Sequence, residues 1–190
     1  GAGGFYAVAD KDLFDLEYWS LEQAKLGKAS PLPLQGKITV ITGAGGAIGS
    51  AIVKVFETAG AEVVAVDINA EALAKQGFSQ KVLQKTLDLT KSDQIKELTN
   101  DIVRQYGGVD ILVSNAGTAP QASILDMDED LLRRSLDINF FAHFHLAQAI
   151  GRVFVAQGNS GQMLFNISKQ AVNPGRNFGA YGLRDREGVG

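Results

Sequence analysis

The stretch TGAGGAIG, residues 42–49, constrains the fold more than any other feature, because it joins an expected strand to an expected helix. The β-branched run KITVIT, residues 37–42, is typical of a buried strand, and a helix is expected through residues 51–60. Glycines at such a turn let the backbone approach a pyrophosphate, which also meets the helix N-terminus. The turn therefore predicts a dinucleotide site that includes Gly43, Gly45, Gly46, Ala47, Ile48 and Gly49. The alternative is a purely structural turn.

Asp67 supports the dinucleotide interpretation. It ends the next expected strand, EVVAVD at residues 62–67, and lies eighteen positions after Gly49. A carboxylate there can accept hydrogen bonds from both ribose hydroxyls and repels a 2′-phosphate, which predicts NAD in preference to NADP. Ile68 follows it and belongs to the expected site. The alternative for Asp67 is a strand-end cap. A kinase-type phosphate loop is excluded because Ser50 stands where that loop needs lysine.

Strands and helices alternate along the rest of the chain. Further strands are expected at residues 81–89, 110–114 and 162–168, and further helices at 70–76, 92–107 and 128–157. Apolar strands that alternate with helices indicate a parallel sheet covered on both faces. The expected fold class is therefore α/β, a Rossmann-type doubly wound parallel sheet. Because only five strands are recognisable, we expect the sheet to be incomplete at its C-terminal end.

The first 35 residues differ in character from the rest. The stretch DLFDLEYWSLEQAKLG, residues 12–27, predicts one amphipathic linker helix, followed by a proline-containing connector. We expect this helix to pack on the domain or on a partner. The predicted organisation is an N-terminal helix and linker over residues 1–35, then a dinucleotide-binding domain over residues 36–190 that is truncated at its C-terminus.

Composition excludes several classes of function. The chain has 190 residues, 45% of them hydrophobic, which is enough for one domain with a substantial core. A net charge of −3 argues against nucleic acid or an anionic membrane as the main partner. The absence of cysteine excludes disulfides and thiolate chemistry and fits a cytoplasmic location. His143 and His145 lie two positions apart on an expected helix and cannot share a metal ion, so no metal site is predicted.

Several motifs together resemble the short-chain dehydrogenase/reductase family. TGAGGAIG resembles the TGxxxGxG loop of that family, with Ala47 in place of the usual glycine. LDLT, residues 87–90, resembles a segment that meets the adenine, and SNAG, residues 114–117, resembles the NNAG motif with Ser114 replacing an asparagine. The resemblance covers about residues 36–183. It implies a nicotinamide-dependent oxidoreductase whose cofactor site also contains Asp88, Leu89, Asn115, Ala116 and Gly117.

The resemblance also implies the catalytic residues. In this family a tyrosine exchanges a proton with the substrate oxygen, a serine orients that oxygen, and a helix asparagine supports a lysine. Tyr181 matches the tyrosine, Ser168 stands thirteen positions before it, and Asn139 matches the asparagine. Each has a structural alternative: Ser168 as the end of a strand, Tyr181 as a partly buried aromatic residue, and Asn139 as a satisfied core amide.

The chain departs from the family at the lysine. Position 185, four residues after Tyr181, is an aspartate, and a carboxylate there would raise the pKa of the tyrosine, which catalysis needs lowered from about 10. The closing residues 184–190, RDREGVG, also lose the apolar period of a buried helix. Truncation, a frame shift and misassigned residues stay open as explanations. The second hypothesis for function is accordingly an NAD-binding module without turnover.

Two segments resemble a narrower group, the dehydrogenase part of bifunctional rhamnulose-phosphate aldolase/alcohol dehydrogenase proteins. They are DLFDLEYWSLEQAKLGK, residues 12–28, and SKQAVNPGRNFGAYGL, residues 168–183. In that group an aldolase domain precedes the helix, so the resemblance implies a small alcohol or carbonyl substrate such as lactaldehyde. Family members commonly pair through helices, which implies a homo-oligomer for the intact protein.

Overall fold

The computed structural model describes residues 31–122, 125 and 127–169. The chain divides into two units at Pro33, and every helix and strand described below belongs to the second unit, which begins at Leu34. The predicted linker helix at residues 12–27 lies outside the described residues, as do Tyr181 and Asp185. The expectation that the domain is cut short concerns the same undescribed part of the chain.

Five parallel strands form a single sheet in the order β3-β2-β1-β4-β5. The strands are β1 Ile38–Thr42, β2 Glu62–Asp67, β3 Leu83–Thr86, β4 Ile111–Ser114 and β5 Gln162–Phe165. The helices are α2 Ala47–Thr58, α3 Ala70–Lys75, α4 Ser92–Tyr106, α5 Glu129–Leu136, the π-helix η1 Asp137–Phe141 and α6 Ala142–Gln157. The predicted fold class, an α/β Rossmann-type sheet, is confirmed.

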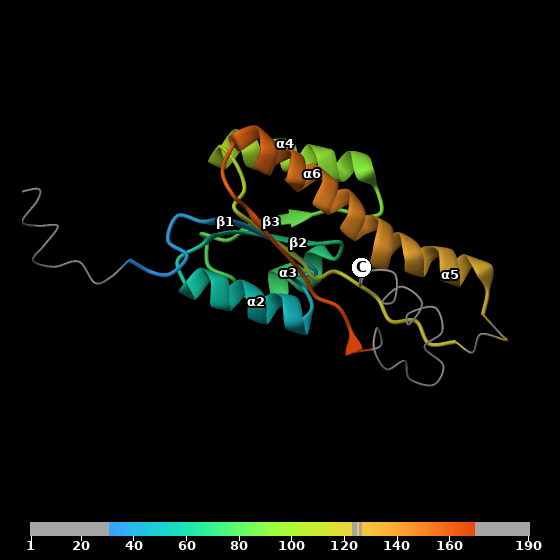
Figure 1. The fold of residues 1–190 in the computed structure, drawn as a ribbon. Helices are drawn as coiled ribbons and strands as arrows, with labels where there is room; N and C mark the ends of the chain where they lie inside the picture. Colours follow the sequence, from blue (N-terminus) through green and yellow to red (C-terminus); the bar gives the residue numbers. More distant parts are fainter. Residues whose placement is uncertain (1–30, 123–124, 126, 170–190) are drawn as a thin grey trace, which may run out of the picture. The chain divides into compact units, whose positions relative to one another are not determined.

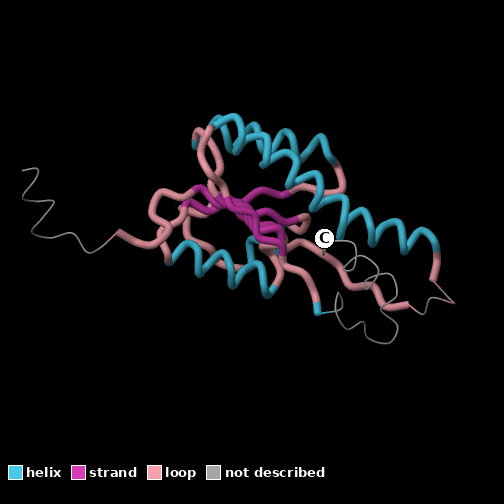
Figure 2. Tube along the Cα trace, viewed as in Figure 1, coloured by secondary structure: helices cyan, strands magenta, loops and turns pink. Residues whose placement is uncertain are grey.

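The sheet is covered on both faces. Figure 1 shows α4 and α6 on one side and α2 and α3 on the other, and Figure 2 shows the strands as one layer between these helices. Alternation along β2 explains the two cores: Val64 and Val66 pack with α4 and α6, whereas Val63 and Ala65 pack with α2 and α3. Because both faces are buried, the strand reads as a continuous apolar run rather than as an alternating pattern.

Several predicted bounds differ from the structure, and the helix expected over residues 51–60 runs over Ala47–Thr58, so it begins inside the glycine stretch. The expected strand at 81–89 is confined to β3, because the chain turns at Asp88, whose Oδ1 accepts hydrogen bonds from the Thr90 N–H and hydroxyl. The expected strand at 162–168 ends at Phe165. The expected helix at 128–157 begins at Glu129 and contains η1, a five-residue π-helix between α5 and α6.

Among the described residues, no helix has the length and apolarity that crossing a membrane would require.

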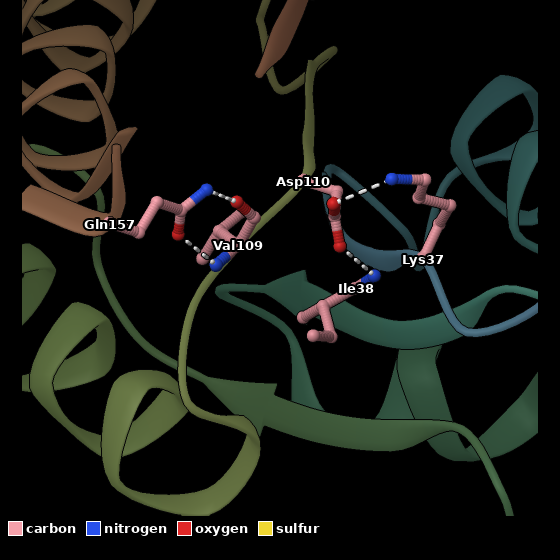
Figure 3. A network of polar contacts seen from close by, with 5 residues as sticks. All are labelled: Lys37, Ile38, Val109, Asp110 and Gln157. Atoms are coloured by element: carbon pink, nitrogen blue, oxygen red, sulfur yellow. Dashed lines mark hydrogen bonds and ion pairs between the residues drawn. The ribbon is translucent and has the colours of Figure 1, made fainter. Parts of the chain in front are cut away.

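Side chains close the amino end of the sheet between β1, β4 and α6 (Figure 3). Asp110, just before β4, accepts hydrogen bonds from the Lys37 ammonium and the Ile38 N–H, both at 2.9 Å. The side-chain amide of Gln157, the last residue of α6, binds both backbone groups of Val109. Its Oε1 accepts from Val109 N at 3.2 Å, and its Nε2 donates to Val109 O at 2.7 Å. These contacts pin the start of β4 to β1 and to α6.

Candidate cofactor-binding and active site

Two adjoining hollows lie at the carboxyl ends of the strands, with volumes of about 530 Å³ and 220 Å³. Both are lined by Gly43, Asp67, Ala116, Gly117 and Thr118. From β1 the chain adds β2 and β3 on one side of the sheet, and it then crosses over to add β4 on the other side of β1. The hollows lie beside β1 and β4, where this change of direction occurs. That is the point of an open α/β sheet where the strand order reverses and where ligands bind.

The structure brings nearly all the predicted cofactor-binding residues together. Apart from Gly45, they all line one or both hollows: Gly43, Gly46, Ala47, Ile48, Gly49, Asp67, Ile68, Asp88, Leu89, Asn115, Ala116 and Gly117. Gly45 touches the site indirectly, because its N–H donates to Asp67 Oδ2 at 2.9 Å. The predicted serine, Ser168, lines the larger hollow beside Asn166 and Ile167.

The glycine turn leaves no room for a Cβ at Gly43, Gly45 or Gly49. Gly43 has φ +67°, and a Cβ there would lie 2.9 Å from the Ala116 Cα. A Cβ on Gly49 would lie 2.0 Å from the Gly43 carbonyl oxygen. The helix α2 then begins at Ala47 with no side-chain cap and no acidic residue in its first turn. Its N-terminus is therefore suited to an anionic group such as a phosphate.

Asp67 is held by backbone groups on both oxygens. Oδ2 accepts from Gly45 N and Oδ1 accepts from Asn69 N, each at 2.9 Å. The carboxylate therefore does serve as a strand-end cap, the alternative considered from sequence, and it also lines both hollows. A carboxylate has about four lone-pair sites, so two backbone bonds leave acceptor capacity for hydroxyl groups in the hollow.

The smaller hollow has an apolar rim. Ile68 is 67% exposed there, while Leu89 is buried. Asp88 Oδ1 is occupied by Thr90, and the Asp88 N–H donates to Gln94 Oε1 at 2.8 Å, which orders this turn ahead of α4. An exposed apolar side chain beside an ordered polar turn can pack on the face of a flat ring, while polar groups of the turn hydrogen-bond the edge of that ring.

Three side chains tie the strand ends together, and two of them were not predicted as site residues. Thr42 Oγ1 accepts from the backbone N–H groups of Asn115 and Ala116, at 2.9 and 3.0 Å. Asn115 Nδ2 donates to the Thr42 carbonyl, and Asn166 Nδ2 donates to Asn115 Oδ1 at 2.8 Å. The missed residues, Thr42 and Asn166, could have been found because each is a polar residue at the end of an apolar strand.

Asn139 lies in η1 and is 3% exposed. Its Oδ1 accepts from Thr118 N at 2.9 Å, and its Nδ2 donates to Thr118 O at 2.9 Å and to Ser135 Oγ at 3.1 Å. The Asn139 amide is therefore a satisfied core group, which was the structural alternative for this residue. It also fixes the backbone of Thr118, which lines the larger hollow. π-Helical insertions occur often at functional sites. A catalytic role for Asn139 stays a prediction.

Two other expected features have defined surroundings. Ser114, which replaces the first asparagine of the NNAG pattern, is fully buried, and its Oγ lies 2.7 Å from His143 Nδ1. His143 therefore packs inward from α6, with its ring centroid 6.3 Å from that of Phe165. Within the described ranges, no group of three or more histidine or acidic side chains is arranged to hold a metal ion.

A parallel sheet with this crevice defines a Rossmann-type dinucleotide-binding domain. The sequence profile of the short chain dehydrogenase family matches residues 37–183. The chain belongs to the short-chain dehydrogenase/reductase family of oxidoreductases, which use nicotinamide cofactors.

The relatives differ in length and in the activity that their names give. The chain is 30% identical to the uncharacterized oxidoreductase YuxG of Bacillus subtilis, in a match that covers 94% of this chain and 27% of that protein. It is 33% identical to an NAD-dependent glycerol dehydrogenase of Listeria innocua, over 71% of this chain and 53% of the relative. It is 35% identical to the 3-oxoacyl-[acyl-carrier-protein] reductase FabG of Thermotoga maritima, over 75% and 61%. The chain thus spans between about a quarter and three fifths of these relatives.

Solved structures share the fold. An NAD+-bound xylitol dehydrogenase superposes with a TM-score of 0.75 at 31% identity, over 80% of this chain and 61% of the other. A short-chain type dehydrogenase/reductase from Mycobacterium marinum also has a TM-score of 0.75, at 29% identity over 82% and 66%.

Proposed function

We propose that this protein is an NAD-dependent oxidoreductase that transfers hydride between the nicotinamide and a small alcohol or carbonyl. The observation that carries the proposal is the Asp67 carboxylate, which lines both hollows at the point where the strand order reverses. The proposed domain runs over residues 36–190, after a helix and linker over residues 1–35. The division of the chain at Pro33 supports it.

The described residues fit a dinucleotide by their chemistry. The turn over Gly46–Gly49 and the N-terminus of α2 would hold the pyrophosphate, and Asp67 would accept the hydroxyls of the adenosine ribose. Ile68, Asp88 and Leu89 would surround the adenine. The bound cofactor supplies the hydride donor or acceptor. Asn115, Ala116 and Gly117 would orient its nicotinamide half toward Ser168, since all four line the larger hollow.

The proposed preference for NAD follows from charge. A 2′-phosphate beside the Asp67 carboxylate would bring two anions together at a site where both carboxylate oxygens are already fixed by backbone donors. Two similar proteins carry NAD in their names, the glycerol dehydrogenase of Listeria innocua and the NAD+-bound xylitol dehydrogenase.

The proposed catalytic residues are Tyr181, Ser168 and Asn139. Tyr181 would pass a proton to the substrate oxygen as hydride arrives, and would remove it in the reverse direction. Ser168, on the wall of the larger hollow, would orient that oxygen. Asn139 would act from η1, where it already fixes the Thr118 backbone.

We further propose the narrower assignment to the dehydrogenase part of bifunctional rhamnulose-phosphate aldolase/alcohol dehydrogenase proteins, with lactaldehyde as substrate. The match to YuxG supports it, because that match covers 94% of this chain but only 27% of a much longer oxidoreductase. A cytoplasmic location and a homo-oligomeric intact protein belong to the same proposal.

One observation favours a second candidate, an NAD-binding module without turnover. Asp185 occupies the position four residues after Tyr181 where the family pattern has a lysine. A carboxylate at that position would raise the pKa of the tyrosine, whereas proton exchange at neutral pH needs that pKa lowered.

Calorimetric titration with NAD and NADP, beside NADH formation from lactaldehyde-type and glycerol-type substrates, separates the two candidates. The enzyme proposal predicts NAD binding with turnover, and it predicts that Tyr181→Phe abolishes turnover while NAD still binds. Binding without turnover would establish the second candidate instead. Turnover that survives Tyr181→Phe would contradict the catalytic assignment.

Cofactor preference has its own test. Asp67→Ala is expected to narrow the ratio of NADP to NAD dissociation constants by about tenfold, since one removed charge repulsion of about 1.4 kcal/mol corresponds to that factor. Asp93→Ala, which removes an exposed carboxylate from the first turn of α4, is the matched control. An unchanged ratio in Asp67→Ala would contradict the ribose role.

A further inference from the structure

Gln76, the residue that follows α3, contacts the glycine turn from outside both hollows. Its Nε2 donates to the Gly45 carbonyl at 2.8 Å and to the Ala72 carbonyl at 3.3 Å. The side chain is half-buried, and Gln76 lines neither hollow at the carboxyl end of the sheet. Its contact joins residues 31 positions apart in sequence, so it is a tertiary contact rather than part of the local helix.

Gly45 is thereby held from both sides. Asp67 Oδ2 accepts its N–H at 2.9 Å, and Gln76 binds its carbonyl. The space around it is tight: a Cβ on Gly45 would lie 2.9 Å from the Ala72 Cβ and 3.1 Å from the Asp67 carboxylate carbon. Any shift of Gly45 must therefore move the Asp67 carboxylate or lose its hydrogen bond.

The hydrogen-bond partners also explain why a neutral donor suits position 76. A carbonyl oxygen needs a donor, which glutamine supplies and glutamate or methionine does not. A glutamate would also place a second carboxylate on Gly45, the residue whose N–H already binds the Asp67 carboxylate. A cationic donor would offset the negative charge of Asp67, and this charge is the feature that disfavours a 2′-phosphate. Glutamine fixes the turn and leaves that charge intact.

We propose that Gln76 is a positioning residue for the cofactor. By fixing Gly45, it holds Asp67 in the orientation that receives the two ribose hydroxyls, and it thereby sharpens the discrimination between NAD and NADP. This inference rests on the proposed NAD site and adds to it a residue that acts only through Gly45 and Asp67.

The test measures NAD and NADP dissociation constants by calorimetry on the full 190-residue chain. The first variant, Gln76→Met, keeps the length of the side chain but removes the donor. The second, Gln76→Glu, places a carboxylate oxygen against the Gly45 carbonyl oxygen. Gln80→Met, an exposed glutamine in the turn after α3, is the matched control. We expect Gln76→Met to weaken NAD binding about five- to tenfold, because one hydrogen bond is lost, with a smaller effect on NADP. Gln76→Glu is expected to weaken NAD binding more, and Gln80→Met is expected to leave both constants unchanged.

A double-mutant cycle with Asp67→Ala separates positioning from general stability. If Gln76 acts through Asp67, Gln76→Met should have little further effect on NAD binding once Asp67 is alanine. An unchanged NAD/NADP ratio in both Gln76 variants, or fully additive effects with Asp67→Ala, would overturn the role of Gln76 while leaving the NAD site in place. A wild-type chain that binds neither dinucleotide would overturn the site itself and this inference with it.

Discussion

The two ends of the parallel sheet are formed by different kinds of residue. The amino end is closed by side chains: Asp110 joins Lys37 and Ile38, and Gln157 pairs with both backbone groups of Val109 (Figure 3). The carboxyl end is built from glycines and small polar residues, in which the side chains of Asp67 and Thr42 accept hydrogen bonds from backbone N–H groups and two hollows stay open.

The difference separates stability from binding. At the amino end Asp110 and Gln157 bond to groups within the fold and line neither hollow of the carboxyl end, so we expect a change there to alter the free energy of unfolding alone. At the carboxyl end the same contacts that hold the strands also shape a place for a ligand. A change there should therefore affect stability and dinucleotide binding together, which the following substitutions examine.

Gly49→Ala should have the largest effect. Its Cβ would fall 2.0 Å from the Gly43 carbonyl oxygen, a backbone atom that cannot move without opening the turn. We expect a loss of about 3 kcal/mol in the free energy of unfolding, at the upper end for overpacking, with loss of NAD binding. Thermal unfolding and calorimetry measure the two effects.

Gly46→Ala is the matched control in the same turn. A Cβ at Gly46 would lie 3.4 Å from the same Gly43 oxygen, an ordinary contact. The free protein should therefore lose less than about 1 kcal/mol. Equal melting temperatures for the two alanine variants would show that the close packing of the turn is not what requires glycine at position 49.

Thr42→Val should come next. Thr42 is fully buried, and its hydroxyl accepts the N–H groups of Asn115 and Ala116, which valine would leave without that acceptor. We expect a loss of about 2 kcal/mol in urea unfolding, together with weaker NAD binding because both residues line the hollows. Thr42→Ser keeps the hydroxyl and should retain most of the binding. A stability loss without a binding loss would contradict the coupling proposed for this end.

Asp110→Ala tests the amino end. It leaves the Ile38 N–H without its carboxylate acceptor and should lower the free energy of unfolding by about 1–2 kcal/mol, with NAD affinity unchanged. A weakened NAD affinity in a folded variant would contradict the separation of the two ends.

The Asp110 contacts also predict a pH dependence. Burial raises the pKa of the Asp110 carboxyl, but the hydrogen bond from Ile38 and the contact with Lys37 outweigh burial, so the pKa is lowered overall. Because the pKa is lower in the folded state than in the unfolded chain, the ionised carboxylate stabilises the fold. This contribution is complete above the unfolded-state pKa of about 3.9 and is lost as pH falls through the folded-state pKa. The stability advantage of wild type over Asp110→Asn should therefore shrink between pH 6 and pH 3. An advantage that grows in acid would mean the opposite sign of shift.

Lys37→Met should have the smallest effect. The Lys37 side chain is 51% exposed, and exposed ion pairs contribute about 0–1 kcal/mol, which salt screens. Unfolding at low and at 1 M salt should show a small difference from wild type that disappears at high salt. A difference that persists at 1 M salt would indicate packing of the lysine stem instead of charge.

Much of this fold could be predicted because its signals are local. The apolar strands, the helical periodicity and the glycine turn each depend on residues within one element. The order of strands and helices along the chain and the parallel class of the sheet followed from these local patterns. Bounds failed where a side chain ends an element early, as Asp88 does by its bonds to Thr90. The π-helix around Asn139 gave no periodic signal, because one extra residue in a turn hardly alters the pattern of apolar positions.

The sequence by itself indicated the class of sheet, the family and many of the residues that meet at its carboxyl end. These depend on periodicity and on motifs whose spacing is preserved along the chain. Only the tertiary structure decided which atoms hold those residues: Gln76 on Gly45, Thr42 on Asn115, and Asn139 on Thr118. The physical reason is that hydrogen bonds between distant segments depend on strand register and helix packing, and no stretch of sequence records these alone.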